Sequence, residues 1–372
     1  MKKVNGHEII QLFEEWAPKK FAYEGDPIGL HIGDLRRPVT KVLVTLDVDE
    51  RIVDEAIAQG AELIIAHHPP LFRPVKSIDT STYQGRVIEK CIKHDIAVYA
   101  AHTNLDIAPG GVNDLLAEKL ELQQIEILDE TYREPLYKLV VFAPVNASEQ
   151  IRTALNEAGA GHIGEYDSCS YSMEGTGRFR PGEKANPHIG TPGTPEEVRE
   201  ERIEVVVPET KKGRVLKALL KAHPYEEPAF DLIRLEQFAR VEGIGRIGRL
   251  QQPMTLETFG QHVKEKLDVP RLRFVGPKDA RIEKVAVLGG DGNKYIHTAK
   301  FRGADVLVTG DMYYHVAQDA ERMGLHIVDP GHNVEKVMIE GVARKMSKDA
   351  KARGYDVQFI ESTIDTEPFT FL

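Results

Sequence analysis

The chain has 372 residues, of which 41% are hydrophobic and 28% are charged. This is the composition of a globular protein and excludes a disordered or fibrous chain. At about 150 residues per domain, the length predicts two or three domains. A net charge of −10 gives no general attraction to nucleic acid.

The sequence contains no apolar run of about 18 residues, so we expect no transmembrane helix and no membrane partner. Gly6, His7 and Glu8 interrupt the region where a signal peptide would have its apolar core. We therefore expect a cytoplasmic protein. Two cysteines, Cys91 and Cys169, are too few for a disulfide framework, and we expect both to be reduced.

The first and last parts of the chain alternate β-branched runs with segments of helical periodicity. Such alternation predicts parallel strands joined by helical crossovers. In the first part, the expected strands are 41–48, 62–70 and 96–106, and the expected helices are 49–60, 85–95 and 110–120. In the last part, the expected strands are 281–292, 304–311, 325–332 and 354–362, and the expected helices are 294–303, 315–324 and 333–350.

The middle of the chain has a different pattern. Around 160–198, a stretch rich in glycine, proline, serine and threonine separates two strand–helix groups. Such a pattern predicts a split βαβ, or ferredoxin-like, α+β unit. We therefore expect a discontinuous α/β domain, with parallel-rich sheets flanked by helices, from 1–129 and 241–372, and an inserted domain at 130–240. The expected strands of the insert are 136–144, 202–209 and 230–235, and its expected helices are 147–159 and 210–223.

Histidines and carboxylates follow several of the expected strands. In an open parallel sheet, ligands bind at the carboxyl ends of the strands, so residues far apart in sequence can meet there. A single histidine at a strand end is more often a packing residue, but several clusters at one edge favour a site. These residues are His67 and His68, His102, Asn104 and Asp106, Asp311 and His315, and Asp329, His332 and Glu335.

Imidazole and carboxylate ligands indicate a metal site. Imidazole suits zinc, iron, copper or nickel, and added carboxylates admit manganese and iron. Three histidines and two carboxylates are too many ligands for one open catalytic zinc. They suit two ions bridged by a carboxylate. His332 and Glu335, three residues apart at a helix start, share one face.

Three further segments carry weaker signals. LGGDGNKY (288–295) could present backbone N–H groups to a phosphate, or form a tight turn. HPYEEPAFD (223–231) could bind a metal or a small ligand, or form a helix-to-strand turn. The basic segment 178–190 could form a nucleic-acid patch, but charge runs are usually solvated loops.

Several motifs together resemble the NIF-three-like family, whose members are also called GTP cyclohydrolase 1 type 2 homologues. The resemblance rests on AHHPPLF (66–72), HTNLDIAPGGVND (102–114), VTGDMYYH (308–315) and GHNVEK (331–336). GDPIGLHIGD (25–34) and GGDGNKY (289–295) resemble two further family segments, although Pro27 stands where many members have asparagine. The insert resembles the CutA/PII-like domain of the longer bacterial members.

The resemblance implies a dinuclear metal site held by His67, His68, Asp106, His332 and Glu335. It also implies a toroidal homohexamer. We expect two divalent metal ions per subunit. Zinc is the favoured metal, and iron and manganese are the alternatives.

The residues favour a metal-dependent hydrolase that works through a metal-bound hydroxide, and the family name implies ring opening of a nucleotide, as by a GTP cyclohydrolase. His102 is the candidate for proton transfer and His315 is the reserve, unless both only orient the ligands. The alternative is a regulatory or interaction protein whose PII-like insert senses a small ligand or partner.

Overall fold

The computed structural model describes residues 2–370, and the chain divides into two compact units. One unit, here the outer unit, combines the described residues up to Thr131 with those from Glu242 onward. The other, here the inserted unit, is Tyr132–Val241. Strands β7 (Gln123–Pro144) and β10 (Phe230–Thr255) begin in one unit and end in the other. None of the helices within residues 2–370 is long and apolar enough to cross a membrane.

The first sheet of the outer unit has the strand order β15-β4-β5-β6-β2. Its four neighbours β15, β4, β5 and β6 are parallel, and β2 is antiparallel to β6. Strands β4, β5 and β6 are short, mostly apolar and buried, as expected for strands that are covered on both faces. The strands of this sheet are β2 (Gly29–Ile32), β4 (Lys41–Thr45), β5 (Leu63–Ala66), β6 (Ala97–Ala100) and β15 (Gln358–Glu361).

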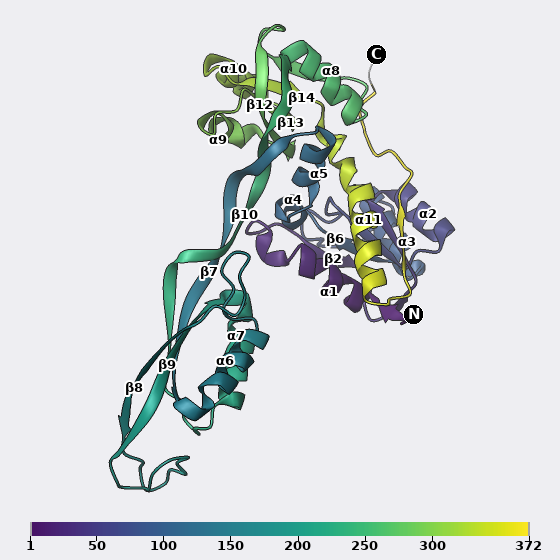
Figure 1. Cartoon of the computed structure of the whole chain (residues 1–372). Helices are drawn as coiled ribbons and strands as arrows, with labels where there is room; N and C mark the ends of the chain where they lie inside the picture. The colour runs from purple at the N-terminus through teal and green to yellow at the C-terminus, as the bar shows by residue number, and fades with distance from the viewer. Residues whose placement is uncertain (1, 371–372) are drawn as a thin grey trace. The chain divides into compact units, whose positions relative to one another are not determined.

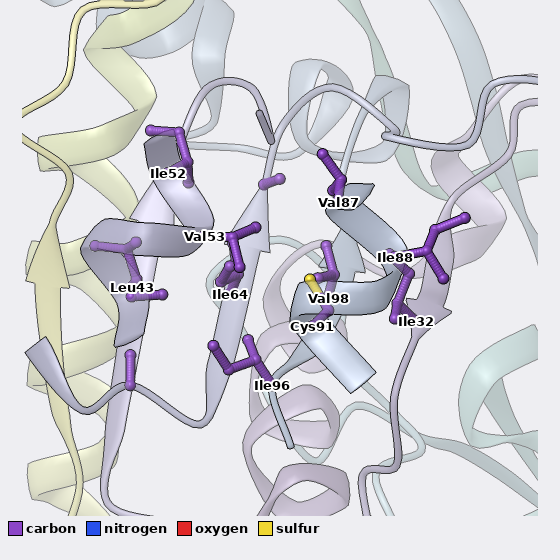
Figure 2. Close-up of a cluster of buried hydrophobic side chains, with 13 residues drawn as sticks. Ile32, Leu43, Ile52, Val53, Ile64, Val87, Ile88, Cys91, Ile96 and Val98 are labelled. Carbon is purple, nitrogen blue, oxygen red and sulfur yellow. The ribbon is translucent and has the colours of Figure 1, made fainter. Parts of the chain in front are cut away.

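Helices α2 (Glu50–Gln59) and α3 (Tyr83–Lys93) cover one face of this sheet. Figure 2 shows their side chains packed over those of the strands in one buried cluster. Both helices begin at side-chain caps, since Asp49 accepts from Ile52 N and Thr82 accepts from Gly85 N. Such caps satisfy backbone donors that a helix start leaves unpaired.

Helices α1 (Gly6–Trp16) and α11 (Val337–Ala352) belong to the same unit and pack on each other. Phe13 of α1 meets the ring of Tyr99 in β6 edge-on, with ring centroids 5.9 Å apart. Our sequence analysis did not identify α1, although Asn5 and Glu8 form a capping box at its start. That pattern is a recognised sign of a helix start. Helices α4 (Thr103–Ile107) and α5 (Val112–Lys119) follow β6.

The second part of the outer unit has the strand order β11-β14-β13-β12-β10 (Figure 1). Strands β12, β13 and β14 are parallel, while β11 and β10 pair antiparallel at either side of them. The strands are β11 (Arg273–Val275), β12 (Arg281–Asp291), β13 (Val306–Gly310) and β14 (His326–Asp329). The helices are α8 (Leu256–Lys266), α9 (Ile296–Phe301) and α10 (Tyr314–Arg322). A further two-stranded sheet pairs β1 (Val4–Asn5) with β3 (Pro38–Val39).

The inserted unit has the element order β7, α6, β8, β9, α7, β10 and the strand order β10-β7-β9-β8. Alternate residues of β7 and β9, such as Leu139, Val141, Ile203 and Val205, form a core with α6 and α7. Strand β8 pairs antiparallel with β9 over nine residues. The bounds are α6 (Ser148–Glu157), β8 (Tyr171–Phe179), β9 (Glu196–Pro208) and α7 (Glu209–Ala222).

The mixed α/β architecture expected from the sequence is confirmed, but several expected elements have wrong extents. The expected strands 136–144 and 230–235 belong to the longer strands β7 and β10, and three further differences concern the polar residues. Strand 62–70 ends at Ala66, and strand 96–106 ends at Ala100. Asp106 therefore lies on α4, where its N–H donates to His102 O. The helix expected at 333–350 begins as the 3₁₀ turn η4 (His332–Lys336). In all three places the chain leaves regular structure where polar side chains gather.

Candidate metal centre

The carboxyl ends of the first sheet present a group of histidines and carboxylates. Asp47 follows β4, His67 and His68 follow β5, and His102 follows β6. The strands are parallel and in register, so their ends lie side by side. The short helix α4 then places Asp106 one turn beyond His102.

The second sheet adds ligands from its own strand ends. Asp311 follows β13, and η4 after β14 carries His332 and Glu335. Glu335 is buried, with 3% of its surface exposed. The site therefore lies where the ends of two separate sheets meet, whereas the sequence pattern alone suggested one sheet edge.

His67 and Asp106 present two buried polar atoms to each other. The Nδ1 atom of His67 donates to the carbonyl oxygen of Ala101 at 2.8 Å. This hydrogen bond directs Nε2 toward the site, 3.5 Å from Oδ1 of Asp106. Within the described residues, neither Nε2 nor Oδ1 has a hydrogen-bond partner. Burial of unpaired polar atoms is costly, and a cation between a nitrogen lone pair and a carboxylate oxygen would satisfy both.

One oxygen of Glu335 lies at the centre of the cluster. Its Oε2 atom is 3.0 Å from Nε2 of His68, 3.1 Å from Nε2 of His332 and 3.7 Å from Nε2 of His67. Three imidazoles from two sheets thus converge on a single carboxylate. A carboxylate in this position could be shared by two ions.

Two further carboxylates orient two of the histidines by accepting hydrogen bonds from their Nδ1 atoms. The Nδ1 atom of His68 donates to Asp47 at 2.7 Å, and that of His332 donates to Asp311 at 2.7 Å. Histidines that bind metals almost always donate their other ring nitrogen in this way, which fixes the ring and its tautomer. Asp47 and Asp311 therefore act as positioning residues.

The cluster favours positive charge. Burial alone would lower the pKa of His68, but contacts with Asp47 and Glu335 outweigh it and raise the pKa to about 10. The contact with Glu335 likewise raises the pKa of His332 to about 9, against burial. Since carboxylates stabilise a charged neighbour, the same groups would stabilise a metal cation.

The pKa values of the two buried carboxyl groups, Asp106 and Glu335, shift in opposite directions. Burial raises the pKa of Asp106 to about 6. Burial would also raise the pKa of Glu335, but His67, His332 and His68 hold it well below its usual range. Glu335 is thus the carboxylate that stays ionised, as a shared metal ligand must.

His102 lies beside the cluster and has its own carboxylate partner. Its Nδ1 donates to Oδ1 of Asp26 at 2.8 Å, and Asp26 also accepts from the backbone N–H and the hydroxyl of Thr103. The ring centroid of His102 is 5.3 Å from that of His67 and 5.9 Å from that of His68. His102 can therefore reach the same space as the two histidines that follow β5.

The structure does not bring His315 to the cluster. His315 is exposed on α10 and contacts Gln318 and Tyr314. Asp329 also has a different role, since it pairs with Arg273 and accepts from Met312 N. Our sequence analysis assigned no role to Asp26 or Asp47. Asp47 had the same signal as the chosen residues, because it lies at the carboxyl end of the expected strand 41–48.

The glycine-rich segment after β12 makes room for Glu335. A Cβ atom on Gly289 would stand 2.9 Å from Oε1 of Glu335, a distance that side chains do not tolerate. The Gly289 N–H donates to Oδ1 of Asn113, so it is not available to a phosphate. Gly289 therefore allows the close approach of the Glu335 side chain, and its N–H does not contribute to a phosphate-binding turn.

A cavity of about 860 Å³ adjoins the centre within the outer unit. His68, His332, Asp47 and Asp311 form one side of it. Its other lining residues include Arg271, Arg273 and the C-terminal residues 366–369. This volume is large enough for a small-molecule ligand.

Three sets of ligand atoms, each within 4.8 Å of one another, could hold a metal ion. Mixed imidazole and carboxylate donors fit zinc, iron or manganese. Glu335 belongs to two of the sets, which together contain the five residues expected from the sequence. The sets are His67, Asp106 and Glu335; His68, His332 and Glu335; and His67, His68 and His102.

A comparison with protein-family models shows to which family this chain belongs. The model for Duf34/NIF3 (NGG1p interacting factor 3) matches residues 4–368. The chain belongs to the DUF34/NIF3 family. The resemblance identified from the sequence motifs is thus confirmed.

Relatives of this DUF34/NIF3 chain match over its full length. A Bacillus subtilis protein named GTP cyclohydrolase 1 type 2 homolog is 56% identical over 371 residues, covering 100% of both chains. A protein of the same name from Halalkalibacterium halodurans is 55% identical, again over 100% of both. Among solved structures, a Bacillus cereus protein related to NIF3 matches with a TM-score of 0.94 and 55% identity over 100% of both chains. A Staphylococcus aureus protein matches with a TM-score of 0.84 and 34% identity, also over 100% of both.

Proposed function

We propose that this chain is a hydrolase that depends on two divalent metal ions and acts on a nucleotide-like substrate. The observation that carries the proposal is Oε2 of Glu335, which lies within 3.0–3.7 Å of three imidazole nitrogens. The relatives' name, GTP cyclohydrolase 1 type 2 homolog, supports ring opening of GTP as the first reaction to test. We propose zinc as the first metal to test, followed by iron and manganese.

The five residues His67, His68, Asp106, His332 and Glu335 would hold the metals. Ions bound there would supply a Lewis acid and lower the pKa of a water molecule. Asp47 and Asp311 keep the rings of His68 and His332 in place. Such prior orientation avoids reorganisation during the reaction.

The adjoining cavity supports an anionic substrate. Arg271 and Arg273 line it together with His68 and His332, and Arg273 also pairs with Asp329. A guanidinium group suits phosphate oxygens in geometry and charge. We propose that the two arginines hold the phosphates while the base faces the centre. The Asp26–His102 pair would then move a proton beside the rings of His67 and His68.

The test uses the full chain loaded separately with zinc, iron or manganese and a panel of nucleotides and phosphoesters. We expect turnover that requires metal and is lost in Glu335→Gln together with the metal. His102→Ala should retain the metals and lose roughly 10²–10⁴-fold in turnover. If His102 only orients ligands, the loss should appear in metal affinity instead, by about 10–100-fold.

The matched control is His315→Ala, which removes an exposed imidazole outside the cluster and should leave turnover unchanged. Failure of the loaded protein to turn over any compound of the panel would contradict the proposed hydrolase.

We also propose that the inserted unit is a ferredoxin-like sandwich of the CutA/PII type. The β-α-β-β-α-β order of β7, α6, β8, β9, α7 and β10 supports it. The family resemblance further leads us to propose a homohexamer. Light scattering of the purified chain tests that assembly, and a monomer at micromolar concentration would contradict it.

A further inference from the structure

The inserted unit contains a second cavity, of about 660 Å³. Strands β8 and β9 contribute one side of it, and the segments 180–189 and 225–229 contribute the other. All of its lining residues belong to the inserted unit. The volume lies in the range of small-molecule sites, and nothing in the metal centre uses it.

Two glycines of β8 open the floor of this cavity. Gly175 pairs directly with Glu200 of β9, and a Cβ atom on Gly175 would meet no atom within 4 Å. A Cβ atom on Gly177 would stand 2.1 Å from Oε2 of Glu200. The carboxylate of Glu200 therefore occupies the space that a side chain at Gly177 would fill, while the space above Gly175 is open.

Glu200 is a buried carboxylate, with 9% of its surface exposed. Its Oε1 accepts a hydrogen bond from the hydroxyl of Tyr225 at 2.9 Å. Within residues 2–370 no cationic side chain forms an ion pair with Glu200. Buried carboxylates are normally paired with a cation, so a positively charged ligand would complete this site.

Two of the three arginines that line the cavity form ion pairs with glutamates, and the third donates to a backbone carbonyl oxygen. Arg178 pairs with Glu197 at 2.8 Å, and Arg202 pairs with Glu204 at 2.8 Å. Arg180 donates to the carbonyl oxygen of Gly193. Glu226 accepts a hydrogen bond from the backbone N–H of Asn186 at 3.1 Å. Arg180 keeps its positive charge, but Glu200, Glu226 and Glu227, which form no ion pair within the described residues, outnumber it in the lining.

Aromatic rings stand around the carboxylate. Phe179 and Tyr225 have ring centroids 6.1 Å apart, and both line the cavity. Phe142 and His188 line it as well, and His188 lies 6.2 Å from Tyr225 between ring centroids. The faces of aromatic rings attract organic cations. A carboxylate among such rings is suited to a cationic nitrogen carried on an apolar body.

We propose that this cavity binds a small organic cation, an amine or amidinium compound, with Glu200 as its counter-ion. The ligand's N–H group donates to Glu200, and its apolar part lies between Phe179 and Tyr225 above Gly175. The HPYEEPAFD segment supplies Tyr225 and Glu226 as one wall of the site.

The test measures binding of benzamidine and of its neutral analogue benzamide to the full chain by calorimetry. We expect benzamidine to bind and benzamide to bind at least about tenfold more weakly, since a charged hydrogen bond is lost. Glu200→Gln should weaken benzamidine binding by a similar factor. The matched control is Glu201→Gln, on the same strand, because neither Glu201 nor its partner Arg152 lines the cavity, and it should bind as the unaltered chain does.

A second variant tests the place of binding without removing a charge. Gly175→Val should fill the open space above β8 and abolish binding while leaving the melting temperature nearly unchanged, because no atom stands in its way. Three results would overturn the proposal: no binding of benzamidine or of spermidine, equal binding of benzamide, or unaltered affinity in Glu200→Gln. Tighter binding of inorganic phosphate than of benzamidine would also overturn it.

Discussion

Gly290 lies so close to Glu335 that a Cβ atom on the glycine would stand 2.8 Å from Oε1 of the carboxylate. The same atom would stand 3.2 Å from Nε2 of His332. Gly290→Ala should therefore displace two proposed metal ligands. We expect metal affinity to fall by about 10–100-fold, as it does when groups that orient ligands are lost. Metal content after dialysis measures it.

Gly290 also has a positive φ of 62°, and an alanine there costs about 1–2 kcal/mol in backbone strain alone. Gly60→Ala controls for that cost, because Gly60 has a φ of 68° and no atom within 4 Å of its Cβ position. Equal metal content in the two variants would show that strain, rather than displacement of Glu335, causes the loss.

The C-terminal segment reaches the metal centre through Thr366. Its hydroxyl donates to Oδ2 of Asp47 at 2.5 Å, and Oδ1 of the same carboxylate accepts from His68. Thr366→Val should loosen Asp47 and lower metal affinity by several-fold, less than the ~10–100-fold expected for a direct partner of a ligand. Calorimetric titration of the metal measures this effect.

Thr363→Val is the matched control, since its hydroxyl donates to Glu55, away from the centre. It should bind metal as the unaltered chain does. An identical loss of metal affinity in both variants would mean that the C-terminal segment supports the centre by its overall packing and not through the hydrogen bond to Asp47.

His223 makes the inserted unit sensitive to acid. Its Nε2 donates to the carbonyl oxygen of Phe142 at 2.9 Å, and its Nδ1 accepts from Tyr225 N at 3.1 Å. Burial lowers the pKa of His223, partly offset by the Phe142 contact and by Glu200, with the charge of His188 adding to the fall. Protonation at Nδ1 would break the bond from Tyr225.

Between the lowered folded pKa and the unfolded value near ~6.5, the unfolded chain binds more protons than the folded chain. The contribution of His223 to stability is therefore present above about pH 6.5 and is lost as pH falls through that window. Hydrogen exchange of the Tyr225 amide should accelerate beyond its intrinsic rate as the pH falls below about 6.5. His223→Gln should remove this extra dependence, and its persistence in the variant would refute the assignment.

The two cysteines should differ in reactivity. Burial raises the pKa of the Cys91 thiol to about 12, and Cys91 is part of the core between α3 and the first sheet (Figure 2). Cys169 is only half-buried. Because the thiolate is the reactive form, Ellman's reagent should titrate one thiol per folded chain and two after denaturation. Protection of Cys91 should disappear only with unfolding.

The sequence allowed the metal centre to be anticipated because its ligands follow strands. Parallel strands place their carboxyl ends together, so His67 and His68 could be grouped with His102 without coordinates. That His332 and Glu335 meet them depends on the meeting of two sheets, which the strand pattern does not give. The orienting contacts could not be anticipated in this way. Which carboxylate faces Nδ1 of His68 depends on side-chain packing, and strand periodicity gives no information about it.

The same distinction applies to the fold. Helix and strand periods identified the crossovers of both sheets, since the apolar residues recur at regular spacing. They did not reveal α4 (Thr103–Ile107), whose five residues are too few to show a helical period. They also did not distinguish one sheet from two, because the order of strands depends on long-range pairing.

The position of Glu335 has a consequence for the synthesis of the chain. Its partner His68 precedes it by 267 residues, and the whole inserted unit is made in between. At about 5–20 residues per second, roughly 13–53 seconds pass after His68 is made before Glu335 exists. During that interval the histidines of the first sheet are exposed without their carboxylate. The site that begins with His68 is therefore completed only once Glu335 has been made.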